Sequence, residues 1–301
     1  MTICIAAFSA ESKAIVCIAD RALTYLGYGA NSESDSGVAK IIELPGNWCA
    51  LFSCDSLTFP KRVLDKIDVA LTGKTSVSRL EIEAAAKKAY EETWWDEIED
   101  QILKPILLTR KDFAARAQDV QPLDSKLVLK LAEEMSAYKQ ICSMIFCGFE
   151  GENPQMFVAY TPCQIDPHDW QGFACIGSGL ETARNQMLWS DYDKDDALES
   201  TLYDVFNAKV ATEVLQGVGY VWDWRILLPG KNPEPVPEKI DKQIDQLWIL
   251  HNRHPFAPKL KDIEAKRAQV AKSISDYAAS LVPPQSKRVK RQPTPSKPQT
   301  S

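Results

Sequence analysis

The sequence predicts an α+β protein with four layers, helix–sheet–sheet–helix (an αββα sandwich), followed by an appended C-terminal helical extension. Strand-like and helical segments gather in separate blocks, which favours α+β over a wound parallel sheet. The strand-like segments are near-continuous apolar runs, so both faces of each sheet should be covered. A proline-rich break follows Leu228, and amphipathic helical patterns resume after it.

The first part of the chain is a β block followed by a helical block. Four short apolar strands are expected over residues 3–8, 14–19, 41–44 and 48–53. Residues 27–37 are rich in Gly, Ser and Asn and are expected to form a loop. Apolar residues at helical spacing then predict helices over 59–71 and 124–139. Between them, Ser78 and Glu81 fit a capping box that opens a helix reaching about Leu103.

The second part repeats this order. Strands are expected over residues 141–149, 155–160, 172–176 and 220–228, and helices over 179–189 and 195–215. Two further helices are expected over 238–250 and 259–281. The resulting division of the chain is a core domain at 1–228, a linker at 229–237, a helical extension at 238–281 and a disordered basic tail at 282–301.

Composition excludes several classes of protein. Apolar residues make up 45% of the 301 residues, as in globular proteins, and no apolar run approaches the ~20 residues of a membrane-spanning helix. The net charge of −6 argues against a protein that mainly binds nucleic acid. Five basic residues and no acidic one lie in 283–301, where a solvated tail is the expected structure.

The cysteines and histidines predict neither a disulfide framework nor a metal site. Most of the eight cysteines lie in apolar runs, and no two are spaced as C-x-x-C. The three histidines are not placed like a metal-binding pair, and no signal peptide is evident. We therefore expect a cytoplasmic protein without a metal or another cofactor.

Thr2 is the first candidate for catalysis. Processing that removes Met1 would leave Thr2 with a free α-amine, whose pKa near ~8 makes it a usable base around neutral pH. Such an amine can activate the hydroxyl of its own residue. The apolar residues after Thr2 would bury it at the start of a strand.

Two further features add to this candidate. The strand at 14–19 ends in Asp20, and Lys40 precedes the next strand after a loop. A strand at 172–176 leads through Gly177-Ser178-Gly179 into a helix. In this order and spacing, the chain from Thr2 to Leu228 resembles the proteasome-like N-terminal nucleophile (Ntn) hydrolases. These include proteasome β subunits and the bacterial proteasome-like proteases. Against that pattern, residues 93–122 are an enlarged helical insert.

The resemblance implies a role for each residue. Thr2 would be the nucleophile of a threonine protease or amidase, with its own amine as the base. Lys40 would lower the cost of forming the alkoxide, and Asp20 would hold Lys40 charged and oriented. Ser178 would bind the amine or an attacking water. The substrates would be peptides, and the subunits would assemble into a homo-oligomeric ring. Whether an ATPase acts as a partner stays open.

Backbone N–H groups around Ser53 and Cys54 would form the oxyanion hole, and here the chain departs from the family. The family usually has glycine at that turn, so a side chain there could narrow the pocket. A supporting Asp and Ser are also not evident before the last strand, where residues 216–219 read Gln-Gly-Val-Gly. The loop between Asp20 and Lys40 is longer than usual.

Purely structural roles for the same residues also stay open. Asp20 and Lys40 could form an ordinary salt bridge, and Ser178 could be only a helix N-cap. Two other functions also stay open: a catalytically silent scaffold with a proteasome-like fold, and a small-molecule amidase on the same fold.

The helical extension carries apolar stripes that two short helices cannot bury alone in water. Because the core is expected to cover its own sheets, we expect these stripes to contact a neighbouring subunit.

Overall fold

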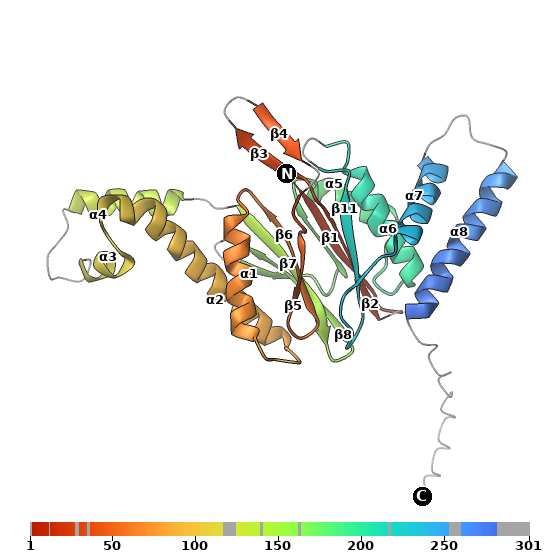
Figure 1. Cartoon of the computed structure of the whole chain (residues 1–301), viewed down its shortest axis with the longest axis horizontal. Helices are drawn as coiled ribbons and strands as arrows, with labels where there is room; N and C mark the ends of the chain where they lie inside the picture. Colours follow the sequence, from red (N-terminus) through yellow and green to blue (C-terminus); the bar gives the residue numbers. More distant parts are fainter. Residues whose placement is uncertain are drawn as a thin grey trace, which may run out of the picture.

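The computed structural model contains two five-stranded antiparallel sheets, a separate two-stranded hairpin, and helices on both sides of the sheets (Figure 1). This content confirms the mixed α and β composition predicted from the sequence. The structure describes residues 2–11, 13–27, 30–34, 37–116, 125–138, 141–161, 164–215, 218–252 and 260–281.

The first sheet has the order β10-β1-β2-β11-β12. Its strands are β1 (Ile3–Ser9), β2 (Ala14–Asp20), β10 (Phe173–Gly177), β11 (Trp222–Leu227) and β12 (Glu234–Pro235). Every residue of β1 and β2 is buried, as expected for strands that are covered on both faces. The short strand β12 lies within the predicted linker and pairs with β11.

The second sheet has the order β5-β6-β7-β8-β9, which follows the chain. Its strands are β5 (Ile41–Leu44), β6 (Trp48–Cys54), β7 (Cys142–Glu150), β8 (Asn153–Tyr160) and β9 (Gln164–Pro167). The turn between β5 and β6 contains Asn47 at φ +66° and Gly46 at φ +74°. Both residue types tolerate this left-handed conformation, which explains the Pro-Gly-Asn sequence there.

Three hydrophobic clusters hold the layers together. One lies between the two sheets and includes Cys4, Ile15, Leu51 and Val158. A second packs the outer face of the first sheet against helices α5 (Leu180–Trp189) and α6 (Leu198–Ala211). A third packs the outer face of the second sheet against α1 (Thr58–Leu71) and α2 (Arg79–Ile98). Alternation along each strand sends successive side chains to opposite clusters.

Helix α2 begins at the predicted capping box. Ser78 accepts the backbone N–H of Glu81, and the Glu81 carboxylate accepts the backbone N–H of Ser78. The helix runs to Ile98 and continues as a π-helical turn, Glu99–Leu103, and a 3-10 turn, Lys104–Ile106. Together with α3 (Arg110–Arg116) and α4 (Ser125–Ala137), the end of α2 forms a projection that we call the helical arm (Figure 1). A small core of its own holds the arm together: Ile98, Leu103, Leu108, Leu131 and Met135.

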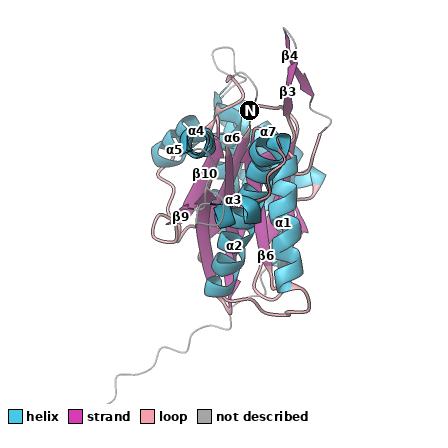
Figure 2. Cartoon of the chain, turned by 90° about the vertical axis from the view of Figure 1, so that its left-hand side faces the viewer, coloured by secondary structure: helices cyan, strands magenta, loops and turns pink. Residues whose placement is uncertain are grey.

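The segment expected to be a loop between Asp20 and Lys40 contains a hairpin instead. Its strands are β3 (Leu23–Gly27) and β4 (Ala30–Ser34), and they pair antiparallel with each other. The hairpin projects from the end of the sheets at which the N-terminus lies (Figures 1 and 2). Strand β4 is polar and lacks the apolar alternation by which strands are predicted, so the composition of residues 27–37 favoured a loop.

The helical extension packs on this chain, which corrects the expected contact with a neighbouring subunit. Helices α7 (Glu238–Asn252) and α8 (Leu260–Leu281) bury Ile244 and Ile274 in the same cluster as α6. The indole N–H groups of Trp222 and Trp224 both donate to Asp241 Oδ1, at 3.1 and 2.9 Å, and tie α7 to β11. The apolar stripes of α7 and α8 therefore pack against the outer side of α6.

The predicted basic tail at 282–301 lies outside the described residues. Among the described helices, none combines the length and the apolar character that a membrane span requires.

Candidate active site

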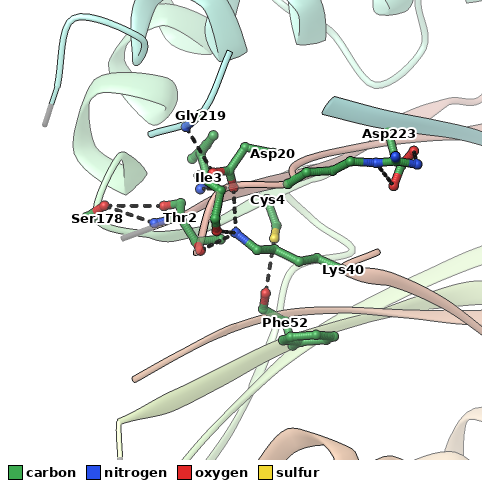
Figure 3. Close-up of polar contacts among 11 residues, drawn as sticks. Thr2, Ile3, Cys4, Asp20, Lys40, Phe52, Ser178, Gly219 and Asp223 are labelled. Atoms are coloured by element: carbon green, nitrogen blue, oxygen red, sulfur yellow. Dashed lines mark hydrogen bonds and ion pairs between the residues drawn. The ribbon is translucent and has the colours of Figure 1, made fainter. Parts of the chain in front are cut away.

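Thr2, Asp20 and Lys40 meet at one end of the two sheets (Figure 3). Lys40 Nζ donates to Thr2 Oγ1 at 2.5 Å and to Asp20 Oδ1 at 3.0 Å. All three side chains are buried, with Asp20 at 0% and Lys40 at 2% exposure. The nucleophile candidate therefore has a cation against its hydroxyl in a site with little water.

The buried ion pair is supported by further backbone groups. Asp20 Oδ1 accepts the N–H of Ile3 at 2.9 Å, and Asp20 Oδ2 accepts the N–H of Gly219 at 3.0 Å. Lys40 Nζ also donates to the carbonyl of Ala22 at 2.7 Å. Burial of two charges is costly unless their remaining hydrogen-bonding capacity is satisfied, and these contacts satisfy it. The pair thus holds the Lys40 ammonium in one orientation, toward Thr2.

Ser178 lies on the other side of Thr2. The backbone N–H of Thr2 donates to Ser178 Oγ at 3.2 Å, and Ser178 Oγ lies 3.4 Å from the Thr2 carbonyl (Figure 3). The preceding Gly177 has φ +104°, and a β-carbon there would lie 2.1 Å from the Thr2 carbonyl oxygen. Only glycine permits this approach of β10 to Thr2. Ser178 makes no N-cap hydrogen bond, because the N-cap of α5 is Gly179.

The predicted oxyanion residues, Ser53 and Cys54, lie at the end of β6, and they face different ways. The Asp55 N–H donates to the Ile141 carbonyl, directly before β7. In an antiparallel pair such hydrogen bonds recur at every second residue, so residue 53 is also hydrogen-bonded to β7. That alternation directs the Ser53 N–H into the ladder with β7. The Phe52 N–H donates to the Lys40 carbonyl on the opposite side. The Cys54 N–H points the same way as that of Phe52, toward the segment that carries Lys40.

The Cys54 side chain does not fill the space beside Thr2. It packs with the cluster between the second sheet and α1 and α2, while Ser53 Oγ lies 3.3 Å from the β-carbon position of Gly177. Burial raises the pKa of the Cys54 thiol to about 11. Burial likewise raises the pKa of Cys4, whose Sγ donates to the Phe52 carbonyl at 3.3 Å. Both thiols are therefore neutral near pH 7 and do not compete with Thr2 as nucleophiles.

The structure brings all four predicted side chains, those of Thr2, Asp20, Lys40 and Ser178, into one connected hydrogen-bond network. Met1 lies outside the described residues, and so do Gln216 and Gly217 of the segment in which a supporting Asp and Ser were sought.

Three contributors were missed by the sequence reasoning: the N–H of Ile3, the carbonyl of Ala22 and the N–H of Gly219. All three act through the backbone, so no side-chain type in the sequence could have marked them.

The network places a buried ammonium group against a hydroxyl. No group of His, Cys, Asp and Glu among the described residues is arranged to hold a metal ion. A hydroxyl that accepts a hydrogen bond from an ammonium group has its ionised form stabilised, which is the requirement for an oxygen nucleophile.

Many solved structures are similar to this chain, and one of them is a eukaryotic HslV from Trypanosoma brucei. The alignment has 15% sequence identity and a TM-score of 0.44, and it covers 75% of this chain and 99% of the HslV chain. No protein-family model matches the sequence, and no curated protein matches it either.

Proposed function

We propose that this protein is a threonine-type N-terminal nucleophile hydrolase that cleaves amide bonds through an acyl-enzyme after Met1 is removed. The observation that carries the proposal is the 2.5 Å contact from Lys40 Nζ to Thr2 Oγ1, in a buried site where Asp20 fixes the lysine. A salt bridge that served stability alone would not need to aim its ammonium at a hydroxyl.

In the first step, the free α-amine of Thr2 takes the hydroxyl proton while Oγ1 attacks the carbonyl carbon of the scissile amide. A bond forms between Oγ1 and that carbon, and the carbonyl becomes an oxyanion. Lys40 stabilises negative charge on Oγ1 as the proton leaves. The N–H of Cys54 is the proposed backbone donor to the oxyanion, a contribution of roughly 3 kcal/mol in comparable sites.

The tetrahedral intermediate then collapses. The protonated amine gives its proton to the leaving nitrogen, the C–N bond breaks, and an ester to Thr2 Oγ1 remains. A water molecule, deprotonated by the same amine, attacks the ester carbon. The bond between that carbon and Thr2 Oγ1 then breaks, the amine returns the proton to Oγ1, and the acid is released. Ser178 Oγ lies 3.2 Å from the Thr2 nitrogen and is placed to orient this amine or the water.

The wider assignments belong to the same proposal. We propose a proteasome-like fold over residues 1–228 and a cytoplasmic homo-oligomeric ring that acts on peptides. We propose no cofactor for this reaction. The antiparallel sheets, the helices on both sides and the buried Thr2 support the fold assignment.

Intact mass spectrometry with a covalent probe tests the proposal. The mature chain should lack Met1, and a peptide epoxyketone or β-lactone should add one label, mapped to Thr2. Thr2→Ala should abolish labelling, whereas Thr2→Ser, which keeps a hydroxyl and a small residue after Met1, should retain it. Full retention of Met1 on a protein that still cleaves amides would overturn the mechanism. Removal of Met1 without labelling or turnover would favour the silent scaffold.

A further inference from the structure

A cavity of about 750 Å³ lies between the helical arm and the end of the second sheet. Trp94, Phe113 and Met135 line it from the arm, and Ser143 and Tyr160 line it from β7 and β8. Its volume is in the range of sites that enclose small organic ligands. We call it the arm cavity.

The described side chains that line the arm cavity offer an apolar surface. None of them is charged. Three of the hydroxyl groups already have partners within the chain: Thr161 donates to the Cys142 carbonyl, Ser136 to the Glu133 carbonyl, and Tyr138 to Glu97. Ile141, at the cavity, is 60% exposed. An apolar ligand would bury this surface without leaving those polar groups unsatisfied.

The wall of the cavity lies near the candidate active site. Ser53 pairs with Ser143 on the next strand, and Ser143 pairs with Tyr160 on the strand after that. Neighbouring strands lie about 4.8 Å apart, so the cavity wall begins roughly one strand spacing from Ser53. Ser53 Oγ in turn lies 3.3 Å from the β-carbon position of Gly177, the glycine that packs on Thr2. One to three residues of extended peptide would span this separation.

We propose that the arm cavity binds an apolar part of the substrate, a large side chain or an acyl group, while the scissile bond lies at Thr2. This proposal rests on the proposed function. It makes the helical arm a specificity element, because three of the large apolar side chains in the cavity wall come from α2, α3 and α4.

A first experiment measures whether the cavity binds an apolar molecule, independently of catalysis. Fluorescence titration of the full chain with anilinonaphthalene sulfonate is compared with two variants on α4. Ala132 lines the cavity, and Ala132→Trp should fill it and weaken probe binding about tenfold or more. Ala137 is exposed on the same helix outside the cavity wall, so Ala137→Trp is the matched control and should bind as the unmodified chain does. Equal binding in the two variants would overturn the proposal.

A second experiment connects the cavity with the substrate. Fluorogenic tetrapeptide amides are compared that differ only by Phe or Ala at one position, scanned along the peptide. At one position the unmodified chain should prefer Phe by about tenfold or more in kcat/KM, and Ala132→Trp should remove that preference while sparing the Ala peptide. An unchanged preference in a variant that no longer binds the probe would refute the substrate role.

The two experiments separate the two proposals. If the unmodified chain neither cleaves these peptides nor is labelled at Thr2, the proposed function fails, and the substrate role of the cavity fails with it. The probe titration still decides in that case whether the arm cavity binds an apolar ligand.

Discussion

Replacing Lys40 with methionine removes the charge at Thr2 and keeps the length of the side chain. Lys40 Nζ lies 2.5 Å from Thr2 Oγ1. With an effective dielectric constant of about 20, a full alkoxide and an ammonium at this separation attract by roughly 6–7 kcal/mol. If about half of the charge develops in the transition state, the loss is about 3 kcal/mol, a decrease in rate of ~10²-fold or more. The hydroxyl of the ground state is neutral, so the effect falls on the chemical step.

The same substitution also leaves the Asp20 carboxylate buried without its cation. Removal of one partner of a buried pair costs about 3–5 kcal/mol of folding free energy, which could reduce the rate through unfolding alone. The double variant Lys40→Met with Asp20→Asn separates the two effects. Asparagine is neutral and still accepts one of the two N–H groups that Asp20 accepts, from Ile3 and Gly219. The double variant should therefore be more stable than the single one and equally slow.

The assay is the second-order rate of β-lactone labelling at Thr2, followed by intact mass. Thermal unfolding and near-ultraviolet circular dichroism report the fold of each variant. A folded double variant that is labelled at the rate of the unmodified chain would refute the reasoning, because the charge of Lys40 would then contribute nothing to the nucleophile.

Three further perturbations have defined outcomes. Gly177→Ala should abolish labelling of Thr2 and lower the melting temperature, because its β-carbon would lie 2.1 Å from the Thr2 carbonyl oxygen. Gly151→Ala, at φ +64° with open space around it, is its control and should cost only about 1–2 kcal/mol of backbone strain. Burial raises the pKa of Asp204 to about 7, so this group stabilises the fold less as pH rises from about 4 toward 7. Asp204→Asn should therefore increase the free energy of unfolding at pH 8 by roughly 1–3 kcal/mol and leave it unchanged near pH 3. Denaturant titrations measure this free energy, and equal effects at both pH values would contradict the prediction. Deletion of residues 230–301 should destabilise or aggregate the monomer, since it uncovers the apolar surface of α6. A monomer of unchanged melting temperature would show that the extension is not part of the core.

The sequence alone determined the local features of this protein. The apolar runs of β1 and β2 predicted strands buried on both faces, because an apolar residue at every position leaves no face for water. The capping box at Ser78 and Glu81 predicted where α2 begins, since its hydrogen bonds join residues three apart. The order of Thr2, Asp20, Lys40 and Ser178 along the chain also indicated the candidate site.

Only the tertiary structure decided how these groups meet. The contact of Lys40 with Thr2 depends on the path of the long β3–β4 segment, and the backbone groups of Ala22 and Gly219 carry no mark in the sequence. The proposal of Cys54 over Ser53 as the oxyanion donor rests on the ladder register, which reverses with a shift of one residue. An amphipathic stripe predicts that a helix packs against an apolar surface, but it does not predict which surface. In the structure, α7 and α8 pack in the same hydrophobic cluster as α6. Each of these outcomes depends on groups far apart in the chain, so packing and not local pattern decides them.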